Sequence, residues 1–249
     1  MTRRYLIFAA CMVMTQAGAT TRIEIPERPT AEQRSGIEAR LNDWAELGRY
    51  AADNARLPAP KASERRVVFM GDSITDFWGR PTGVFFPGKP YINRGISGQT
   101  TPQMLVRFRA DVITLKPSVV VILAGTNDIA GNTGPSSLAM IEDNLMSMTE
   151  LARAHGIRVV LASLLPVAAD AEQTTRRPPE SIRALNAWMR TYAARERLGF
   201  IDYYDAMTDA QGALRKDLTD DGLHPNAAGY AVMAPLAQTA IDHALHDDH

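Results

Sequence analysis

The sequence predicts an α/β fold in which helices cover both faces of a five-stranded parallel sheet. Short, continuously apolar segments are typical of strands buried on both faces, and the clearest reads Val-Val-Val-Ile-Leu within residues 118–124. Amphipathic helical segments alternate with these runs, which is the pattern of βαβ units. The sequence contains no internal repeat, so we expect these strands and helices to form one three-layer α/β/α domain over residues 61–249. A helical extension over residues 20–60 should precede it.

The helix of the extension begins at a capping box. Thr30 is followed three positions later by Gln33, so each side chain can satisfy a free backbone N–H of the first turn. Pro58 and Pro60 end the helical pattern. Between these limits apolar residues recur at helical spacing, which predicts a single helix whose apolar face packs on the domain: Ile37, Leu41, Trp44, Leu47 and Ala51.

The first half of the domain should contain two strands and one helix. The apolar run at residues 67–70 predicts a buried strand, and the shorter run at 91–93 predicts a second one. Thr101 and Pro102 resemble a helix cap followed by proline at the first helical position. The helix they begin has its apolar face at Met104, Leu105, Phe108, Val112 and Leu115.

The second half should alternate three strands with three helices. We expect the strands at residues 118–124, 157–165 and 200–203, and the helices at 137–155, 179–198 and 227–245. The first two of these helices are each followed closely by a glycine, which favours helix termination. The helix at 179–198 also has one apolar stripe: Ile182, Leu185, Met189 and Tyr192.

The first 19 residues have the three parts of a secretory signal peptide. Arg3 and Arg4 are followed by a short apolar run and by the small-residue pattern Ala17-Gly18-Ala19, so we expect cleavage after Ala19 and a secreted or periplasmic protein. The run is too short to span a bilayer, which needs roughly 20 apolar residues. A lipoprotein box ending at Cys11 is disfavoured, because only about six apolar residues would precede it.

Composition excludes several classes of function. Lys and Arg number 27 and Asp and Glu number 28, so the basic excess of a nucleic-acid-binding protein is missing. A single cysteine allows neither an intrachain disulfide nor a cysteine-based zinc site. We expect no cofactor and no metal. The sequence leaves the oligomeric state open.

Polar, glycine-containing segments follow the predicted strands. They lie at residues 71–75, 95–98 and 125–128, and a fourth precedes the last helix at 221–225. Ligands and catalytic groups of parallel sheets gather beyond the carboxyl ends of the strands. We therefore expect these four segments to meet at one edge of the sheet.

The residues at this edge can perform acyl transfer, which needs a nucleophile, a base, a group that orients the base and donors for an oxyanion. Of the five histidines, only His224 falls in a loop at this edge. A turn would bring Asp221 to its ring, and Ser73 follows a strand and a glycine. Each of the three also has a structural explanation on its own, as a helix cap, a turn former or a loop histidine.

Four ordered motifs resemble those of the SGNH, or GDSL, hydrolases. Gly71-Asp72-Ser73-Ile74-Thr75 is similar to their first block, with Ile in place of Leu. Gly98, Asn127 and Asp221-x-x-His224-Pro are similar to the second, third and fifth blocks. Residues 164–166 and 95–100 further resemble the platelet-activating-factor acetylhydrolase-like branch, which favours short acyl groups. The resemblance implies a flavodoxin-like three-layer fold.

The resemblance also implies a role for each matching residue. Ser73 would be the nucleophile, His224 the general base and Asp221 the residue that orients the base. The backbone N–H groups of Ser73 and Gly98 and the side-chain amide of Asn127 would form the oxyanion hole. Such donors suit the task, because glycine allows close approach and asparagine supplies a fixed, neutral N–H.

We therefore predict a serine esterase that removes short acyl groups, acetyl above all, from sugars or glycans, with a small-molecule or glycan ester as its binding partner. The alternatives are a broad thioesterase or lysophospholipase, an acyltransferase, and a glycan-binding module that has lost turnover. Phe77 and Trp78 either line a substrate pocket or pack the loop that follows Ser73. Asp128 is a further candidate for substrate binding, with the alternative that it holds loops by hydrogen bonds.

Overall fold

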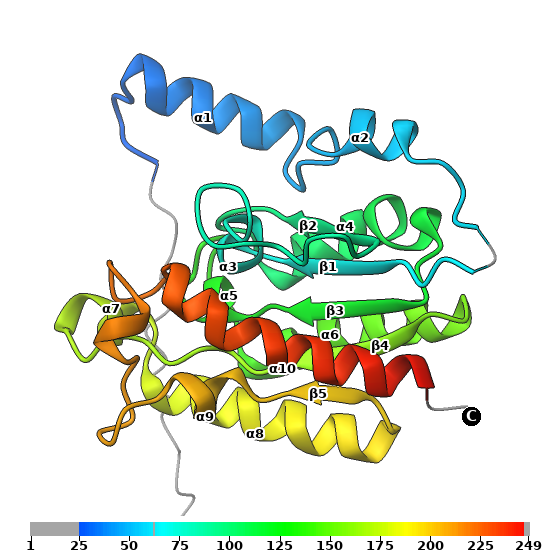
Figure 1. Ribbon diagram of the computed structural model, residues 1–249. Coiled ribbons are helices and arrows are strands. Elements are labelled where there is room, and N and C mark those ends of the chain that lie inside the picture. The colour runs from blue at the N-terminus through cyan, green and yellow to red at the C-terminus, as the bar shows by residue number, and fades with distance from the viewer. Residues whose placement is uncertain (1–24, 62, 247–249) are drawn as a thin grey trace, which may run out of the picture.

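The computed structural model describes residues 25–61 and 63–246 and has the predicted parallel sheet at its centre (Figure 1). Its five strands lie in the order β2-β1-β3-β4-β5, and all neighbours are parallel. Their bounds are β1 Val67–Gly71, β2 Tyr91–Gly95, β3 Val119–Leu123, β4 Arg158–Ala162 and β5 Gly199–Ile201. In this register Gly71 lies opposite both Gly95 and Leu123, so these strand ends are level at one edge of the sheet.

Helices cover both faces of the sheet, as the sequence predicts. The long ones are α4 Thr101–Asp111, α6 Leu138–Ala154, α8 Pro179–Glu196 and α10 Ala227–His246. The short α3 Ser73–Asp76, α5 Thr126–Ile129, α7 Ala171–Arg176 and α9 Tyr203–Met207 were not anticipated. In Figure 1, α10 crosses in front of the sheet and contacts β3, β4 and β5, while α4 and α6 lie behind it. The layer behind continues through the contact of α6 with α8.

The core predicted for the α/β domain is observed. Val67, Val68, Val120 and Val160 are completely buried. The stripe expected on α8 is buried along its whole length, with Tyr192 the most exposed of its four residues at 5%. The α/β fold class is therefore confirmed, and packing between the sheet and its two helical layers forms its core.

Several bounds differ from expectation by one to four residues, and three of these differences have a clear structural reason. The fourth strand stops at Ala162, not at residue 165. The side chain of Asn186 replaces a neighbouring strand as the partner of Leu164, because it accepts the Leu164 N–H at 2.7 Å and donates to the Leu164 carbonyl at 3.0 Å. The fifth strand ends at Ile201, because Asp202 caps α9. Thr100, not Thr101, caps α4, with Gln103 completing a capping box.

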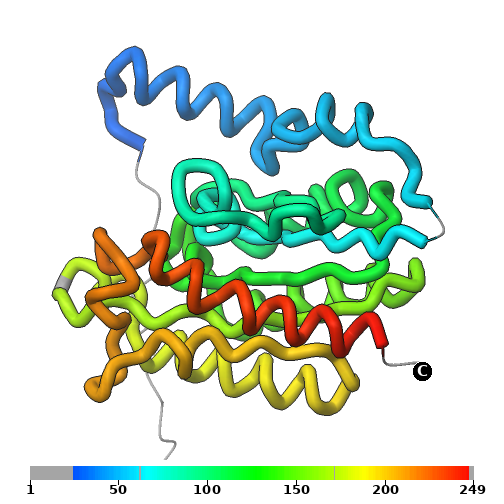
Figure 2. Tube along the Cα trace, viewed as in Figure 1, coloured from blue at the N-terminus to red at the C-terminus, as the bar shows by residue number. Residues whose placement is uncertain are grey.

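The extension is two helices, not the single helix that its periodicity predicts. The capping box of Thr30 forms, but α1 spans only Ala31–Asn42, and α2 Ala51–Arg56 follows after a turn. The carboxylate of Asp43 ends α1 by accepting the N–H groups of Leu47 and Gly48 at 2.8 and 2.9 Å. No residue of α1 is buried, so the expected packing of this helix on the domain is wrong. Figure 2 shows α1 standing clear of the body.

The extension is attached through the segment that follows α1. Tyr50 is 2% exposed, and its hydroxyl donates to the carbonyl of Gly95 at the end of β2. The guanidinium groups of Arg49, Arg80 and Arg94 surround its ring at 5.5, 5.4 and 4.6 Å from the centroid. Cations over an aromatic face are attracted to its electron density, so this tyrosine anchors the extension to the body.

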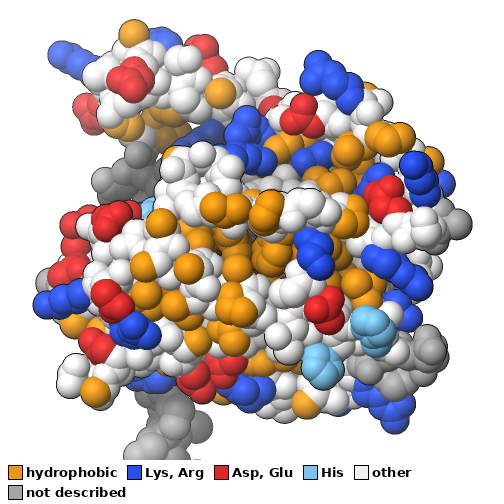
Figure 3. Space-filling view, in the orientation of Figure 1, with side chains coloured by type: hydrophobic (Ala, Val, Ile, Leu, Met, Phe, Trp, Pro, Cys, Tyr) orange, Lys and Arg blue, Asp and Glu red, His pale blue; other side chains and the backbone are white. Residues whose placement is uncertain are grey.

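Residues 1–24, with the predicted signal peptide, its cleavage site and Cys11, lie outside the described residues. Within the described part of the chain, none of the helices combines the length and apolar character that crossing a bilayer requires. Figure 3 shows charged side chains of both signs spread over the face that carries α10, in keeping with the nearly balanced composition.

Candidate active site

Ser73 lies where β1 ends and α3 begins. The preceding Asp72 caps α3 by accepting the N–H of Ile74 at 3.0 Å. A side chain at Gly71 would place its Cβ 2.1 Å from Thr75 Oγ1 and 3.0 Å from the Leu123 carbonyl, so the sharp turn from strand to helix needs glycine. The turn presents Ser73 at the carboxyl edge of the sheet with 9% of its surface exposed.

His224 and Asp221 come together in a tight loop before α10. Thr219 holds this loop, because its hydroxyl donates to the carbonyl of His224 at 2.8 Å and accepts the N–H of Gly222 at 3.0 Å. The ring Nδ1 of His224 lies 2.5 Å from Asp221 Oδ2. Its Nε2 lies 2.9 Å from Ser73 Oγ, although 151 positions separate the two residues in the chain. The three side chains thus form one continuous hydrogen-bonded series.

The two carboxyls of this region have opposite pKa shifts. Partial burial of Asp221 opposes its ionisation, but the hydrogen bonds from the His224 ring and from the backbone of His224 and Leu223 outweigh it and lower the pKa of Asp221 to about 2. Burial dominates at Asp72 and raises the pKa of its carboxyl to about 6. Asp72 is 1% exposed, and its Oδ2 has no hydrogen-bond partner among the described residues.

The loop that follows β2 lies beside the Ser73 turn. The N–H of Ile96 donates to the carbonyl of Gly71 at 3.0 Å, and the N–H and hydroxyl of Ser97 donate to Asp76 at 3.1 and 2.8 Å. The next residue, Gly98, has a φ of +79°, which favours glycine. The loop therefore brings Gly98 close to the turn, as the motif order predicts.

Asn127 reaches the same loop from the end of β3. It lies in α5, is 4% exposed, and its side-chain amide donates to the carbonyl of Gln99 at 3.1 Å. Asn132 binds both neighbours, since its backbone N–H donates to the Asn127 carbonyl and its side chain donates to the Gly98 carbonyl, each at 3.0 Å. Gly98 and Asn127 are thus joined through one network of hydrogen bonds.

Sequence reasoning missed Gln99 and Arg107, two buried residues that hydrogen-bond to this network. Gln99 Oε1 accepts from Arg107 Nε at 2.6 Å, and the same guanidinium donates to the Gly71 carbonyl at 3.2 Å and to Asp111 at 3.0 Å. Arg107 is completely buried. A signal was available, because Arg107 and Asp111 follow Met104 and Phe108 by three positions and therefore lie beside the apolar face of α4.

Two expected substrate-binding residues have structural roles instead. Asp128 is 2% exposed, and its carboxylate accepts from the N–H and hydroxyl of Thr101 at the start of α4. Trp78 is 2% exposed and stacks on Tyr230 at 5.1 Å between ring centroids. Neither side chain is open to a substrate. Phe77 remains a candidate, because its ring lies 5.0 Å from the ring of His224.

The sequence profile of the GDSL-like lipase/acylhydrolase family matches residues 69–232, which include all of the residues brought together here. The chain belongs to this family. It is accordingly a hydrolase of the esterase and acylhydrolase type.

Relatives of the GDSL-like hydrolases agree with this assignment. Esterase TesA of Pseudomonas aeruginosa is 29% identical over 184 residues, which cover 68% of this chain and 83% of that protein. The crystal structure of a GDSL-like lipase from Bacteroides thetaiotaomicron is 45% identical, covers 81% of this chain and 99% of its own, and superposes with a TM-score of 0.77. Axe2, an acetylxylan esterase from Geobacillus stearothermophilus, shares the fold with 23% identity, coverage of 74% and 96%, and a TM-score of 0.60.

Proposed function

We propose that the protein is a serine esterase that removes short acyl groups through an acyl-enzyme. The observation that carries the proposal is the series from Ser73 Oγ to His224 Nε2 at 2.9 Å and from His224 Nδ1 to Asp221 at 2.5 Å. A base at hydrogen-bond distance from a serine, held by an ionised carboxylate, is the arrangement that activates a hydroxyl for attack on an acyl carbon.

In the proposed reaction, His224 Nε2 takes the hydroxyl proton while Ser73 Oγ bonds to the carbonyl carbon of the ester. The negative oxygen that forms is held by the N–H groups of Ser73 and Gly98 and by the amide of Asn127. His224 then gives its proton to the leaving alcohol as the carbon–oxygen bond breaks. Water, deprotonated by His224, attacks the acyl-enzyme, and the acid leaves as Ser73 regains its proton.

We propose an acetyl ester of a sugar or glycan as the substrate. Axe2, which shares the fold, is an acetylxylan esterase, and the residues around Gly98 resemble a branch that favours short acyl groups. Phe77, beside the ring of His224, would limit the space for the acyl chain. The amino-terminal pattern of residues 1–19 favours export to the periplasm or the medium, where glycans are accessible.

The test is hydrolysis of 4-nitrophenyl esters with two, four, eight and twelve acyl carbons by the wild type and by Ser73→Ala. We expect the acetate to be the best substrate, and we expect Ser73→Ala to lower kcat by a factor on the order of 10⁴ or more with an unchanged melting temperature. Equal turnover by the two proteins would refute the mechanism. A preference for twelve carbons would favour a lysophospholipase or thioesterase, and acyl transfer to an added alcohol in place of acid release would favour an acyltransferase.

A further inference from the structure

We propose that α1 is the outer wall of the site for the leaving-group alcohol, and that Arg40, Trp44 and Arg176 bind a sugar chain that carries the ester. The inference rests on the proposed esterase function and assigns a role to the extension that precedes the family domain. It starts from a large cavity between α1 and the body.

The cavity has a volume of about 1320 Å³. Pockets for small ligands usually measure about 300–1,000 Å³, so this space exceeds what an acetyl group needs and can hold several sugar units. On the inner side it is lined by Gly98 and Asn132, which belong to the network around the proposed oxyanion hole. Ser73 and His224 do not line it, so a chain lying in the cavity would reach the reacting ester past Gly98.

The outer side of the cavity belongs to the extension. Ile37, Arg40 and Leu41 of α1 line it, together with Trp44 from the following turn. None of the α1 residues is buried, and Leu41 is 81% exposed, so this face of the helix is not occupied by packing within the described residues.

The wall is fixed at its base to the loop of the proposed oxyanion hole. The side-chain amide of Gln99 donates to the Ala45 carbonyl at 2.9 Å, and that of Gln103 donates to the Trp44 carbonyl at 2.6 Å. The residues that follow Gly98 thus hold the turn from which α1 projects. This attachment sets the position of the wall relative to the reacting atoms.

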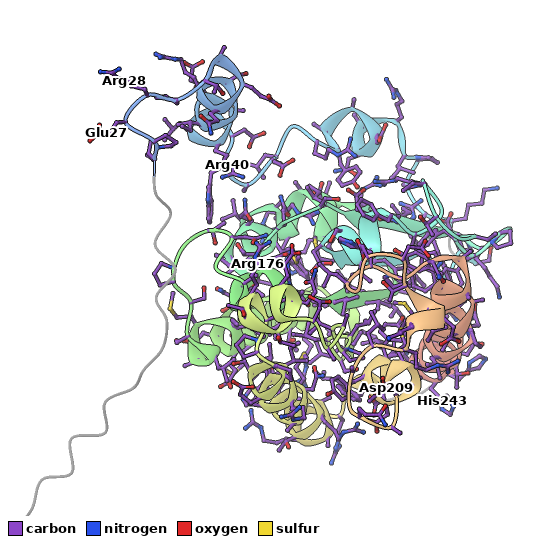
Figure 4. All side chains as sticks on the ribbon, turned by 90° about the vertical axis from the view of Figure 1, so that its left-hand side faces the viewer. Glu27, Arg28, Arg40, Arg176, Asp209 and His243 are labelled. Carbon is purple, nitrogen blue, oxygen red and sulfur yellow. The ribbon has the colours of Figure 1, made fainter. Side chains whose placement is uncertain are left out.

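Two arginines lie on opposite sides of the space. Figure 4 shows Arg40 on the side of α1 that faces the body and Arg176 on the body below it, whereas Arg28 lies at the far end of the segment. Neither Arg40 nor Arg176 forms an ion pair within the described residues, and Arg176 has only a 3.4 Å hydrogen bond to Asn132. Their N–H groups are available to a ligand.

The chemistry of the lining favours a sugar chain over a lipid. Trp44 is 42% exposed and offers an aromatic face, which suits the apolar C–H face of a sugar ring. Glu46 and Glu180 also line the cavity and provide acceptors for hydroxyl groups. A long acyl chain would have to bury these charges beside it at a large cost in free energy, whereas hydroxyl groups can bind both acceptors and donors.

The experiment measures kcat/KM on acetylated xylo-oligosaccharides of two to six sugars relative to kcat/KM on 4-nitrophenyl acetate. Acetylated oligogalacturonides are run in parallel to distinguish neutral from acidic chains. We expect the ratio to rise with chain length in the wild type and to fall about tenfold for the longest chain in Arg40→Ala and in Trp44→Leu. Trp44→Phe, which keeps a ring, should retain most of the ratio, and Arg28→Ala, on the same segment but outside the cavity, should match the wild type.

Measuring oligosaccharide binding tests this inference independently of the proposed ester hydrolysis. Ser73→Ala titrated with unacetylated xylohexaose and with hexagalacturonate should bind one of them, and adding Arg40→Ala should weaken that binding about tenfold. The inference would be overturned if hydrolysis depends on Ser73 but no substitution at Arg40 or Trp44 changes the kcat/KM ratio for xylo-oligosaccharides or for oligogalacturonides. The esterase proposal would then remain intact. Arg40-dependent sugar binding without turnover of any ester would support the cleft and refute the esterase proposal.

Discussion

Asp221 contacts His224 with both of its carboxylate oxygens. Oδ2 lies 2.5 Å from the ring Nδ1, and Oδ1 accepts the backbone N–H of His224 at 2.7 Å. One side chain therefore fixes both the ring and the backbone that carries it. Oδ1 also accepts the N–H of Leu223 at 2.9 Å, so the carboxylate organises the whole loop around the proposed base.

Asp221→Asn should lower kcat strongly while the loop keeps its shape. The amide oxygen can still accept the two backbone N–H groups, but the amide N–H would face Nδ1 and force the ring proton onto Nε2, where it blocks removal of the Ser73 proton. The measured loss in a comparable triad is about 10⁴-fold. Because the pKa of Asp221 is about 2, its carboxylate is ionised throughout the usual assay range, and the loss should hold at every pH above about 4.

Asp220→Asn is the matched control for this substitution. Asp220 is the adjacent carboxylate, and among the described residues its side chain accepts a single hydrogen bond, from Asn226 at 3.3 Å. We expect its kcat to stay within about twofold of the wild type. A loss below tenfold in Asp221→Asn would contradict the pairing with His224.

Asn127→Ala should lower kcat by about 10²–10³-fold with a much smaller change in KM, because the lost donor acts on charge that develops only in the transition state. The variant also leaves the Gln99 carbonyl without its 3.1 Å hydrogen bond, so a loss of about 1 kcal/mol in stability is expected. Asn144→Ala, which removes a 3.0 Å bond to the Thr101 hydroxyl, provides a control with a similar stability loss. Equal kcat values for the two variants would exclude Asn127 from the oxyanion hole.

Asp72→Asn should stabilise the protein more at pH 7.5 than at pH 4. The pKa of the Asp72 carboxyl is about 6 in the folded state, against 3.8 for the ordinary group, so the folded state holds the proton more tightly than the unfolded state. The contribution of Asp72 to stability is therefore greatest below about pH 4 and falls as the pH rises through 6. A difference of about two pKa units corresponds to about 3 kcal/mol.

Urea unfolding of the wild type and Asp72→Asn at the two pH values measures this change, because contributions from the other titratable groups cancel in the difference. The amide retains an oxygen for the Ile74 N–H, so the cap of α3 should persist. If the free energies of unfolding of the variant and the wild type differ by the same amount at pH 4 and pH 7.5, the pKa of the Asp72 carboxyl is not raised in the folded state.

Arg107→Leu should destabilise the protein by about 3–5 kcal/mol, because it leaves the carboxylate of Asp111, which is 2% exposed, without its cationic partner. The Gly71 carbonyl and Gln99 Oε1 lose donors in the same step. The midpoint of urea unfolding gives the loss, and Arg109→Leu, an exposed position on the same helix, should change it by less than about 0.5 kcal/mol. Similar unfolding midpoints for Arg107→Leu and Arg109→Leu would show that the buried Arg107–Asp111 pair contributes little to stability.

The positions of the motifs relative to the strands and helices predict where the sheet and the site lie. Parallel strands end at a common edge, so the Ser73 turn after β1 and the loop of Asp221 and His224, which precedes α10 in the connection from β5, come to the same edge whatever their separation in the chain. A short local pattern was also sufficient for the cap at Thr30, whose hydroxyl accepts the N–H of Gln33.

Other features depend on partners that are distant in sequence. The fourth strand ends where Asn186, 22 residues after Leu164, binds the backbone, and no local signal at residues 162–165 indicates this. The apolar spacing continues past Asp43, but Trp44 and Leu47 are 42% and 46% exposed, and Ala45 and Tyr50, which lie outside the predicted stripe, are the residues buried against the body. Gln99 was missed because its role depends on Arg107, Asn127 and Ala45 at once.

The distance of 151 positions between Ser73 and His224 has a consequence for synthesis. A ribosome adds about 5–20 residues per second, so the proposed nucleophile of a growing chain is made roughly 8–30 seconds before the proposed base. During this interval the serine is an ordinary hydroxyl. If Ser73 and His224 act as proposed, unfinished or prematurely terminated chains have no esterase activity, and activity begins once the loop before α10 has docked on the sheet.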